Sequence, residues 1–129
     1  EWVTFSLGTK SLRNLGGVHP DLVKVVKLAI KRSPVDFQVA EGLRTLARQK
    51  LLVAQGFSKT MKSRHLTGHA VDLIPLLNGK LRWDWPAIYQ IAPVVKLAAA
   101  ELKVPIEWGG DWRSFKDGPH YQLPWKDYP

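Results

Sequence analysis

SRHLTGHAVDLI, residues 63–74, joins a polar, basic loop to an apolar run that is typical of a buried strand. His65 lies at the mouth of this expected strand and Asp72 lies within it. Side chains of a strand alternate between its two faces, so Ala70 and Asp72 should point the same way. Gly68 and Ala70 leave little side-chain bulk between His65 and Asp72, which would let both converge on one cation. An unpaired buried carboxylate is costly, so Asp72 needs a cation or several hydrogen-bond donors.

A second histidine lies near the C-terminus, in Asp117-Gly118-Pro119-His120, three residues after a carboxylate. The chain has no cysteine, so a thiolate metal site is excluded. Two imidazoles and one carboxylate suit a catalytic zinc ion, with a water in the fourth position. By spacing alone, however, distant histidines also fit hydrogen-bonded core or surface residues. The candidates His65, Asp72 and His120 therefore indicate a site of some kind.

Hydrophobic periodicity and turn residues outline the other elements. We expect a helix from Pro20 to Ser33-Pro34, a short strand at 37–39, a helix from Thr45 to about Gln55, a turn at Asn78-Gly79, a helix from Asp84 to about Leu102, and short strands around 106–108 and 120–123. Pro93 should kink the last helix because it removes one backbone donor. This arrangement predicts an α+β fold, a small antiparallel sheet with flanking helices, in a single catalytic domain over residues 1–129.

The net charge of +8 indicates an anionic partner, which could be nucleic acid, an acidic membrane surface or an acidic polymer such as the cell wall. The basic residues are scattered, so a solvated surface with a positive bias explains the charge equally well. No apolar run approaches the roughly 20 residues that span a bilayer, and we expect no membrane span. The N-terminus lacks the layout of a signal peptide and an initiator Met, so a trimmed or processed start remains open.

The motif Ser63-x-His65-x-x-Gly68-x-Ala70-x-Asp72, followed by Asp117-x-Pro119-His120, resembles the signature of the D-alanyl-D-alanine carboxypeptidase-like zinc peptidases. These enzymes belong with the lysostaphin-type enzymes and the hedgehog-like fold. Other segments are also similar to the family, so the resemblance covers nearly the whole chain: Val18–Leu22, Gly42–Thr45 with Gln49, and Trp108–Trp112. The short single-domain form is most similar to the L-alanyl-D-glutamate endopeptidases of phage endolysins.

The resemblance implies that His65, Asp72 and His120 bind Zn²⁺ and that Asp117 is the general base. It also implies that Arg44 stabilises the oxyanion of the scissile carbonyl, a role that suits a fixed positive donor. Some family members carry Glu where Asp117 stands. The implied function is a zinc-dependent peptidoglycan endopeptidase that hydrolyses the L-alanyl-D-glutamate bond of the stem peptide. The alternative is a D,D-carboxypeptidase or dipeptidase acting on D-alanyl-D-alanine, because the two activities share the metal site.

Two other classes of protein also fit parts of the sequence: a zinc-stabilised binding module without catalysis, and a nucleic-acid-binding protein. The first needs neither Asp117 nor Arg44, and the second rests on charge alone. We therefore expect bacterial peptidoglycan as the partner, no nucleic acid, and a monomer held in the host cytoplasm until lysis. Trp108 and Trp112 are candidates for the substrate groove, whereas His69 should point away from the face of Asp72.

Overall fold

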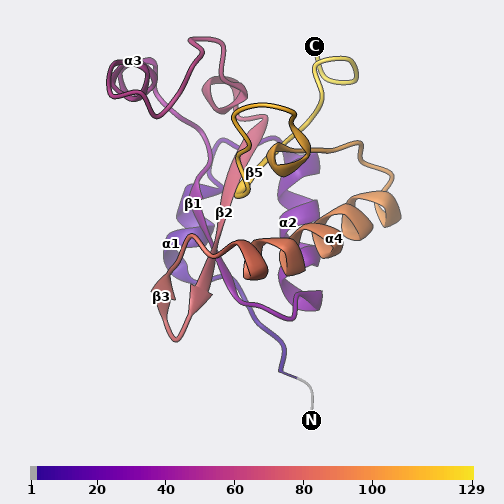
Figure 1. The fold of residues 1–129 in the computed structure, drawn as a ribbon. Coiled ribbons are helices and arrows are strands. Elements are labelled where there is room, and N and C mark those ends of the chain that lie inside the picture. The colour runs from indigo at the N-terminus through magenta and orange to yellow at the C-terminus, as the bar shows by residue number, and fades with distance from the viewer. Residues whose placement is uncertain (1–2) are drawn as a thin grey trace.

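The computed structural model describes residues 3–129 and contains every helix and strand that the sequence predicts. In chain order the elements are α1 (Thr9–Asn14), α2 (Pro20–Arg32), β1 (Phe37–Glu41), α3 (Leu46–Ala54), the 3-10 helix η1 (Arg64–Thr67), β2 (Ala70–Leu77), β3 (Lys80–Leu81), α4 (Trp85–Glu101), β4 (Glu107–Trp108), the 3-10 helix η2 (Gly109–Asp111) and β5 (His120–Gln122) (Figure 1). The predicted α+β class is confirmed.

The sheet is antiparallel throughout, with the strand order β1-β2-β5-β4 and with β3 paired to the far end of β2. The long central strand β2 alternates its side chains between two environments. Val71 and Leu73 are buried in the core, whereas Asp72 and Ile74 on the opposite face are less buried and line a cleft. The sheet therefore separates a hydrophobic core from a polar, accessible face.

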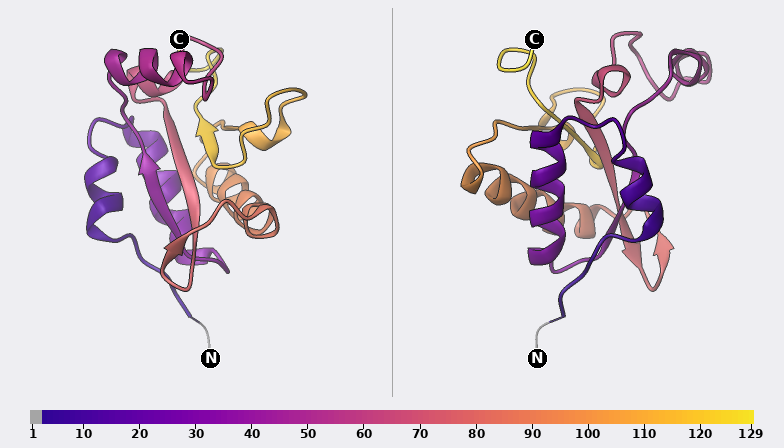
Figure 2. Two further views of the ribbon diagram at one scale, coloured as in Figure 1. Left: turned by 60° about the vertical axis from the view of Figure 1, so that its left-hand side comes forward. Right: turned by 180° about the vertical axis from the view of Figure 1, so that it is seen from behind.

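Helices α2 and α4 pack together and complete the core beneath the sheet. The buried residues of α2 recur at helical spacing on one side, as the sequence predicts: Leu22, Val25, Val26, Ala29 and Ile30. Seen from behind, α1 and α2 lie over the sheet, while α3 stands apart at the end of the molecule that carries the C-terminus (Figures 1 and 2). The helices thus leave the polar face of the sheet open.

Helix α1 is not among the elements that the sequence predicts. It covers the free edge of β1, where Ser11 Oγ accepts a hydrogen bond from the main-chain N–H of Val39 and the Asn14 side-chain amide donates to the Val39 carbonyl. Capping the edge strand in this way blocks pairing with another chain. The helix has six residues and buries only Ser11, so it carries no apolar stripe that a periodicity search would detect.

Helix α4 continues through Pro93, which is exposed, without a break between Trp85 and Glu101. The kink expected at Pro93 stays a prediction. Among residues 3–129, no helix has the combination of length and apolar content that crossing a membrane requires.

Candidate metal centre

Asp72 and His120 are brought together by strand pairing, because they are direct partners in the register of β2 and β5. His65 approaches from η1. The Oδ1 atom of Asp72 lies 3.3 Å from Nε2 of His65 and 3.5 Å from Nδ1 of His120. All three ligand atoms lie within 4.8 Å of one another. The three residues that the sequence singled out therefore form one cluster at the open face of the sheet.

His65 presents an unprotonated nitrogen to this cluster. Its Nδ1 lies 2.8 Å from the carbonyl oxygen of Gly42, which can only accept a hydrogen bond, so Nδ1 carries the proton. The lone pair of the neutral ring is therefore on Nε2. This atom is fully buried and has no hydrogen-bond partner within residues 3–129.

His120 is held in the complementary tautomer. Its Nε2 lies 2.8 Å from Oε1 of Gln122, an acceptor, so Nε2 donates and the lone pair of the neutral ring is on Nδ1. The Trp112 ring packs beside this imidazole with the ring centres 5.1 Å apart. Both histidines thus turn an acceptor nitrogen toward the carboxylate of Asp72.

This convergence fits a metal ion. Two imidazole lone pairs and a carboxylate oxygen are all acceptors, and Oδ1 of Asp72 is, like Nε2 of His65, buried without a hydrogen-bond partner in the described chain. Tetrahedral zinc with bonds of about 2.0–2.2 Å separates its ligand atoms by about 3.3–3.6 Å. The two distances from Asp72 Oδ1, 3.3 and 3.5 Å, lie in that range. A cation of this kind would satisfy atoms that are otherwise costly to bury.

The charges within the cluster shift the pKa values of Asp72 and His120. Burial opposes the charge of Asp72, but the neighbouring His65 and His120 outweigh it and lower the pKa of the carboxyl group. Burial likewise opposes the charged form of His120, but its contact with Asp72 raises the pKa of the imidazole.

The turn before β2 places His65. Ser63 Oγ caps η1 by accepting a hydrogen bond from the His65 N–H, which assigns Ser63 a capping role. Gly68 ends η1 in the left-handed region, with φ 76°. A Cβ on Gly68 would lie 2.2 Å from the carbonyl oxygen of Gly17. Gly68 therefore provides this turn and close packing, and its effect on the space between His65 and Asp72 stays a prediction.

Asp117 lies beside the three-residue cluster, in the loop before β5. Burial raises the pKa of its carboxyl group, and the negative charge of Asp72 adds to that shift. Gly109 packs tightly against the loop, because a Cβ there would lie 2.3 Å from the Asp117 carbonyl oxygen and 3.1 Å from Cβ of His120.

Arg44 reaches the other side of the cluster, with Nη2 3.6 Å from Oδ2 of Asp72. Its guanidinium is held by Glu41, at 3.0 Å from Nε, and by Gln49, at 2.7 Å from Nη1. Gln49 is fully buried and also donates to the Thr60 carbonyl, so it links Arg44 to the loop after α3. The sequence reading identified Arg44 but missed Glu41, although it lies three residues earlier on the same segment.

The cluster lies in a cleft of about 670 Å³ on the open face of the sheet. Its lining includes three carboxylates and a larger set of basic side chains: Glu41, Asp72, Asp117, Arg44, Arg48, Lys59, Lys62, Arg64 and Lys116. Trp112 lines the cleft, as expected of a groove residue. Trp108 does not, because its ring is buried and its Nε1 donates to the Gly118 carbonyl at 2.6 Å. His69 contacts His19 and Tyr128, away from the cleft.

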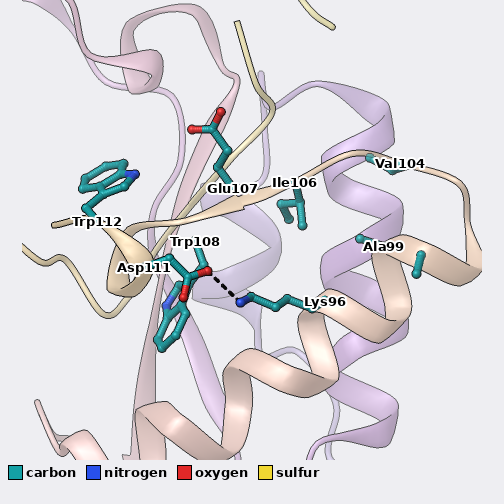
Figure 3. A pocket seen from close by; sticks show the side chains of 9 residues that line it. Lys96, Ala99, Val104, Ile106, Glu107, Trp108, Asp111 and Trp112 are labelled. Carbon is teal, nitrogen blue, oxygen red and sulfur yellow. Dashed lines mark hydrogen bonds and ion pairs between the residues drawn. The ribbon is translucent and has the colours of Figure 1, made fainter. Parts of the chain in front are cut away.

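A second pocket of about 530 Å³ lies between α4 and β4 (Figure 3). An ion pair of Lys96 and Asp111, 2.7 Å long, crosses it, and the walls are largely apolar. Trp112 lines both this pocket and the cleft. The second pocket contains none of the three clustered ligands, so the chemistry of the molecule is concentrated in the cleft.

Comparison with known proteins supports the resemblance. The family model described as phage L-alanyl-D-glutamate peptidase matches residues 3–123. The L-alanyl-D-glutamate peptidase of Escherichia phage T5 is 35% identical over 119 residues, which cover 89% of this chain and 87% of the phage protein. The enzyme of the same name from Listeria phage A118 is 38% identical over 94 residues, covering 73% of this chain and 32% of that protein.

A solved structure agrees with these relatives. The crystal structure of the Serratia marcescens L-Ala D-Glu endopeptidase ChiX matches with a TM-score of 0.92 and 50% sequence identity, covering 98% of this chain and 95% of that one. The match covers nearly the whole chain, rather than an isolated motif. This chain belongs to the phage L-alanyl-D-glutamate peptidase family.

Proposed function

We propose that this protein is a zinc-dependent peptidoglycan endopeptidase that hydrolyses the L-alanyl-D-glutamate bond of the stem peptide. Family membership supports the bond and the substrate. The observation that carries the metal is the convergence of His65, Asp72 and His120, whose three acceptor atoms lie within 4.8 Å of one another. Two of these atoms are buried without a hydrogen-bond partner in the described chain.

When bound, zinc supplies a Lewis acid and lowers the pKa of a coordinated water to about 7. The chain's own residues supply the proton acceptor and the donor to the oxyanion. Asp117 accepts a proton at its carboxylate, a role that its raised pKa and its place beside the cluster suit. Arg44 donates from its guanidinium to the negative charge that develops on the scissile carbonyl oxygen. Glu41 and Gln49 hold that guanidinium in place.

The charge of the cleft fits the proposed substrate. The cleft is bordered by α3, by the loop after it and by the loop before β5, and basic side chains line much of it. These cations complement the carboxylates of the stem peptide. Trp112 adds an aromatic surface next to His120.

Digestion of purified muropeptides tests the bond. We expect one fragment ending in L-alanine with a free carboxylate and one beginning with D-glutamate with a free amine, both identified by mass spectrometry. Free D-alanine as the sole product would instead support the D,D-carboxypeptidase. Activity should vanish with a chelator, return with added zinc and be absent in His120→Ala. Activity that persists after complete metal removal would contradict the zinc proposal.

The proposal extends to the state and location of the protein. We propose that it acts as a monomer, which light scattering at working concentration would measure directly. Because two relatives come from phages, we also propose that it stays in the host cytoplasm until lysis. Fractionation of intact expressing cells tests this, and protein outside the inner membrane before lysis would contradict it.

A further inference from the structure

The two histidines of the proposed metal centre are oriented by different kinds of partner. His65 is fixed by the main-chain carbonyl of Gly42, which can only accept a hydrogen bond. His120 is fixed by the side-chain amide of Gln122, which can present either its oxygen or its NH₂ group. Gln122 by itself therefore does not decide which nitrogen of His120 carries the proton.

Glu107 sets the orientation of the Gln122 amide. It lies directly opposite Gln122 in the register of β4 and β5, and its Oε2 lies 3.3 Å from Nε2 of Gln122. An ionised carboxylate only accepts, so the NH₂ group of the amide turns to Glu107 and the amide oxygen turns to His120. Nε2 of His120 then carries the hydrogen, and Nδ1 keeps its lone pair toward Asp72, 3.5 Å away.

The surroundings fit this role. Gln122 is 8% exposed, so its amide has little access to water that could satisfy it in either orientation. The carboxylate of Glu107 points away from Lys96, whose ammonium group is bound to Asp111 instead (Figure 3). Glu107 is thus exposed to solvent, and its carboxylate accepts a hydrogen bond from the buried amide of Gln122.

We infer that Glu107 and Gln122 are a positioning pair that selects the tautomer of His120 and so the nitrogen that it offers to zinc. The inference rests on the proposed metal centre. Without Glu107 the amide can rotate and offer its NH₂ group to His120, which favours the tautomer protonated on Nδ1. That tautomer has no lone pair toward Asp72, so zinc binding must first reverse it. Outer partners of this kind typically change metal affinity by about 10- to 100-fold.

The experiment compares wild type with Glu107→Gln, Gln122→Leu and the exchange variant Glu107→Gln/Gln122→Glu. The exchange keeps the net charge and restores the direction of both hydrogen bonds, because a carboxylate at 122 accepts from His120 and from the amide at 107. Glu101→Gln makes the same chemical change at a surface residue that is paired with Arg32 and does not line the cleft, and it serves as the control. Thermal unfolding of each variant verifies that it is folded.

Two quantities are measured: the zinc dissociation constant, by competition with a chromophoric chelator, and the His120 tautomer in the metal-free protein, by ¹⁵N NMR at a pH where the ring is neutral. Gln122→Leu should weaken zinc binding about tenfold or more, and Glu107→Gln about threefold or more, each with increased Nδ1 protonation. The exchange variant should return both quantities toward wild type. Unchanged tautomer and affinity in Glu107→Gln would overturn the inference. Failure of wild type to bind zinc would overturn the metal centre instead, while the NMR measurement would still test the pair.

Discussion

Asp72 and His120 face each other across the β2–β5 pair, with 3.5 Å between the Oδ1 and Nδ1 atoms. Main-chain hydrogen bonds set this relationship, including one of 2.8 Å from the Leu73 N–H to the Pro119 carbonyl. A slip of one residue would turn Asp72 into the core and Val71 toward the cleft. The proposed metal centre therefore depends on strand register as much as on the residues that would bind the ion.

Zinc affinity should fall as the pH is lowered, and the fall should begin above the ordinary imidazole pKa of about 6.5. The pKa of His120 is raised, so its ring holds a proton to higher pH, and zinc must displace that proton to bind. Calorimetric titrations at a series of pH values would measure the effect. An onset of the fall well below pH 6.5 would contradict it.

Asp117→Asn should lower kcat by about 10²–10⁴-fold while leaving zinc affinity within a few-fold of wild type, because the amide cannot accept the proton. Since the pKa of Asp117 is raised, the acid limb of the wild-type activity profile should lie above the usual aspartate value of about 3.9. Asp117→Glu should keep part of the activity. Steady-state kinetics and metal analysis of the same samples check both points, and loss of zinc from Asp117→Asn would assign Asp117 to the metal instead.

Arg44→Lys should lower kcat by about 10²–10³-fold with a smaller change in KM, as expected when a donor to the transition state is lost. A lysine ammonium cannot bind Glu41 and Gln49 in the planar arrangement of the guanidinium. Arg48→Lys, at a half-exposed residue that also borders the cleft, is the matched control. Equal losses of zinc affinity and activity in Arg44→Lys would show that Arg44 acts by holding Asp72.

Gly109→Ala should greatly reduce both activity and zinc affinity. The added Cβ would lie 2.3 Å from the carbonyl oxygen of Asp117, so the loop that carries Asp117 and His120 must move. Overpacking of this kind costs about 1–3 kcal/mol of stability. Gly8→Ala is the control because nothing lies within 4 Å of its added Cβ. Wild-type kinetics in Gly109→Ala would mean that the loop can shift without disturbing the site.

Tyr128→Phe should destabilise the protein at neutral pH by about 0.5–1.5 kcal/mol, because it removes a hydrogen bond of 2.7 Å to Asp21. That bond raises the pKa of Tyr128 to about 12. Its contribution is complete below the unfolded pKa of about 10 and is lost as the pH rises through 12. Denaturant unfolding of both proteins between pH 7 and 12 would show the two stabilities converging. A constant difference across that range would contradict the assignment.

Much of the fold could be read from local signals. The apolar stripe of α2, the Thr45 and Asp84 caps and the Asn78-Gly79 turn all appear in the structure as expected. Helix α1 could not be read in this way, because its contribution is polar: it satisfies the edge of β1 through Ser11 and Asn14. Such long-range hydrogen bonds leave no periodic pattern in the sequence.

The same distinction between local signals and long-range contacts applies to the site. The sequence by itself determined the donor types, because without cysteine only imidazoles and carboxylates can bind zinc, and a strand aspartate without a partner is too costly to bury. Only the tertiary structure decided which partners orient those donors. Gln122 shares a strand with His120, but its orientation depends on Glu107 of another strand, and Arg44 depends on Glu41 and Gln49. A hydrogen bond has direction, and that direction is fixed by neighbours that only folding brings together.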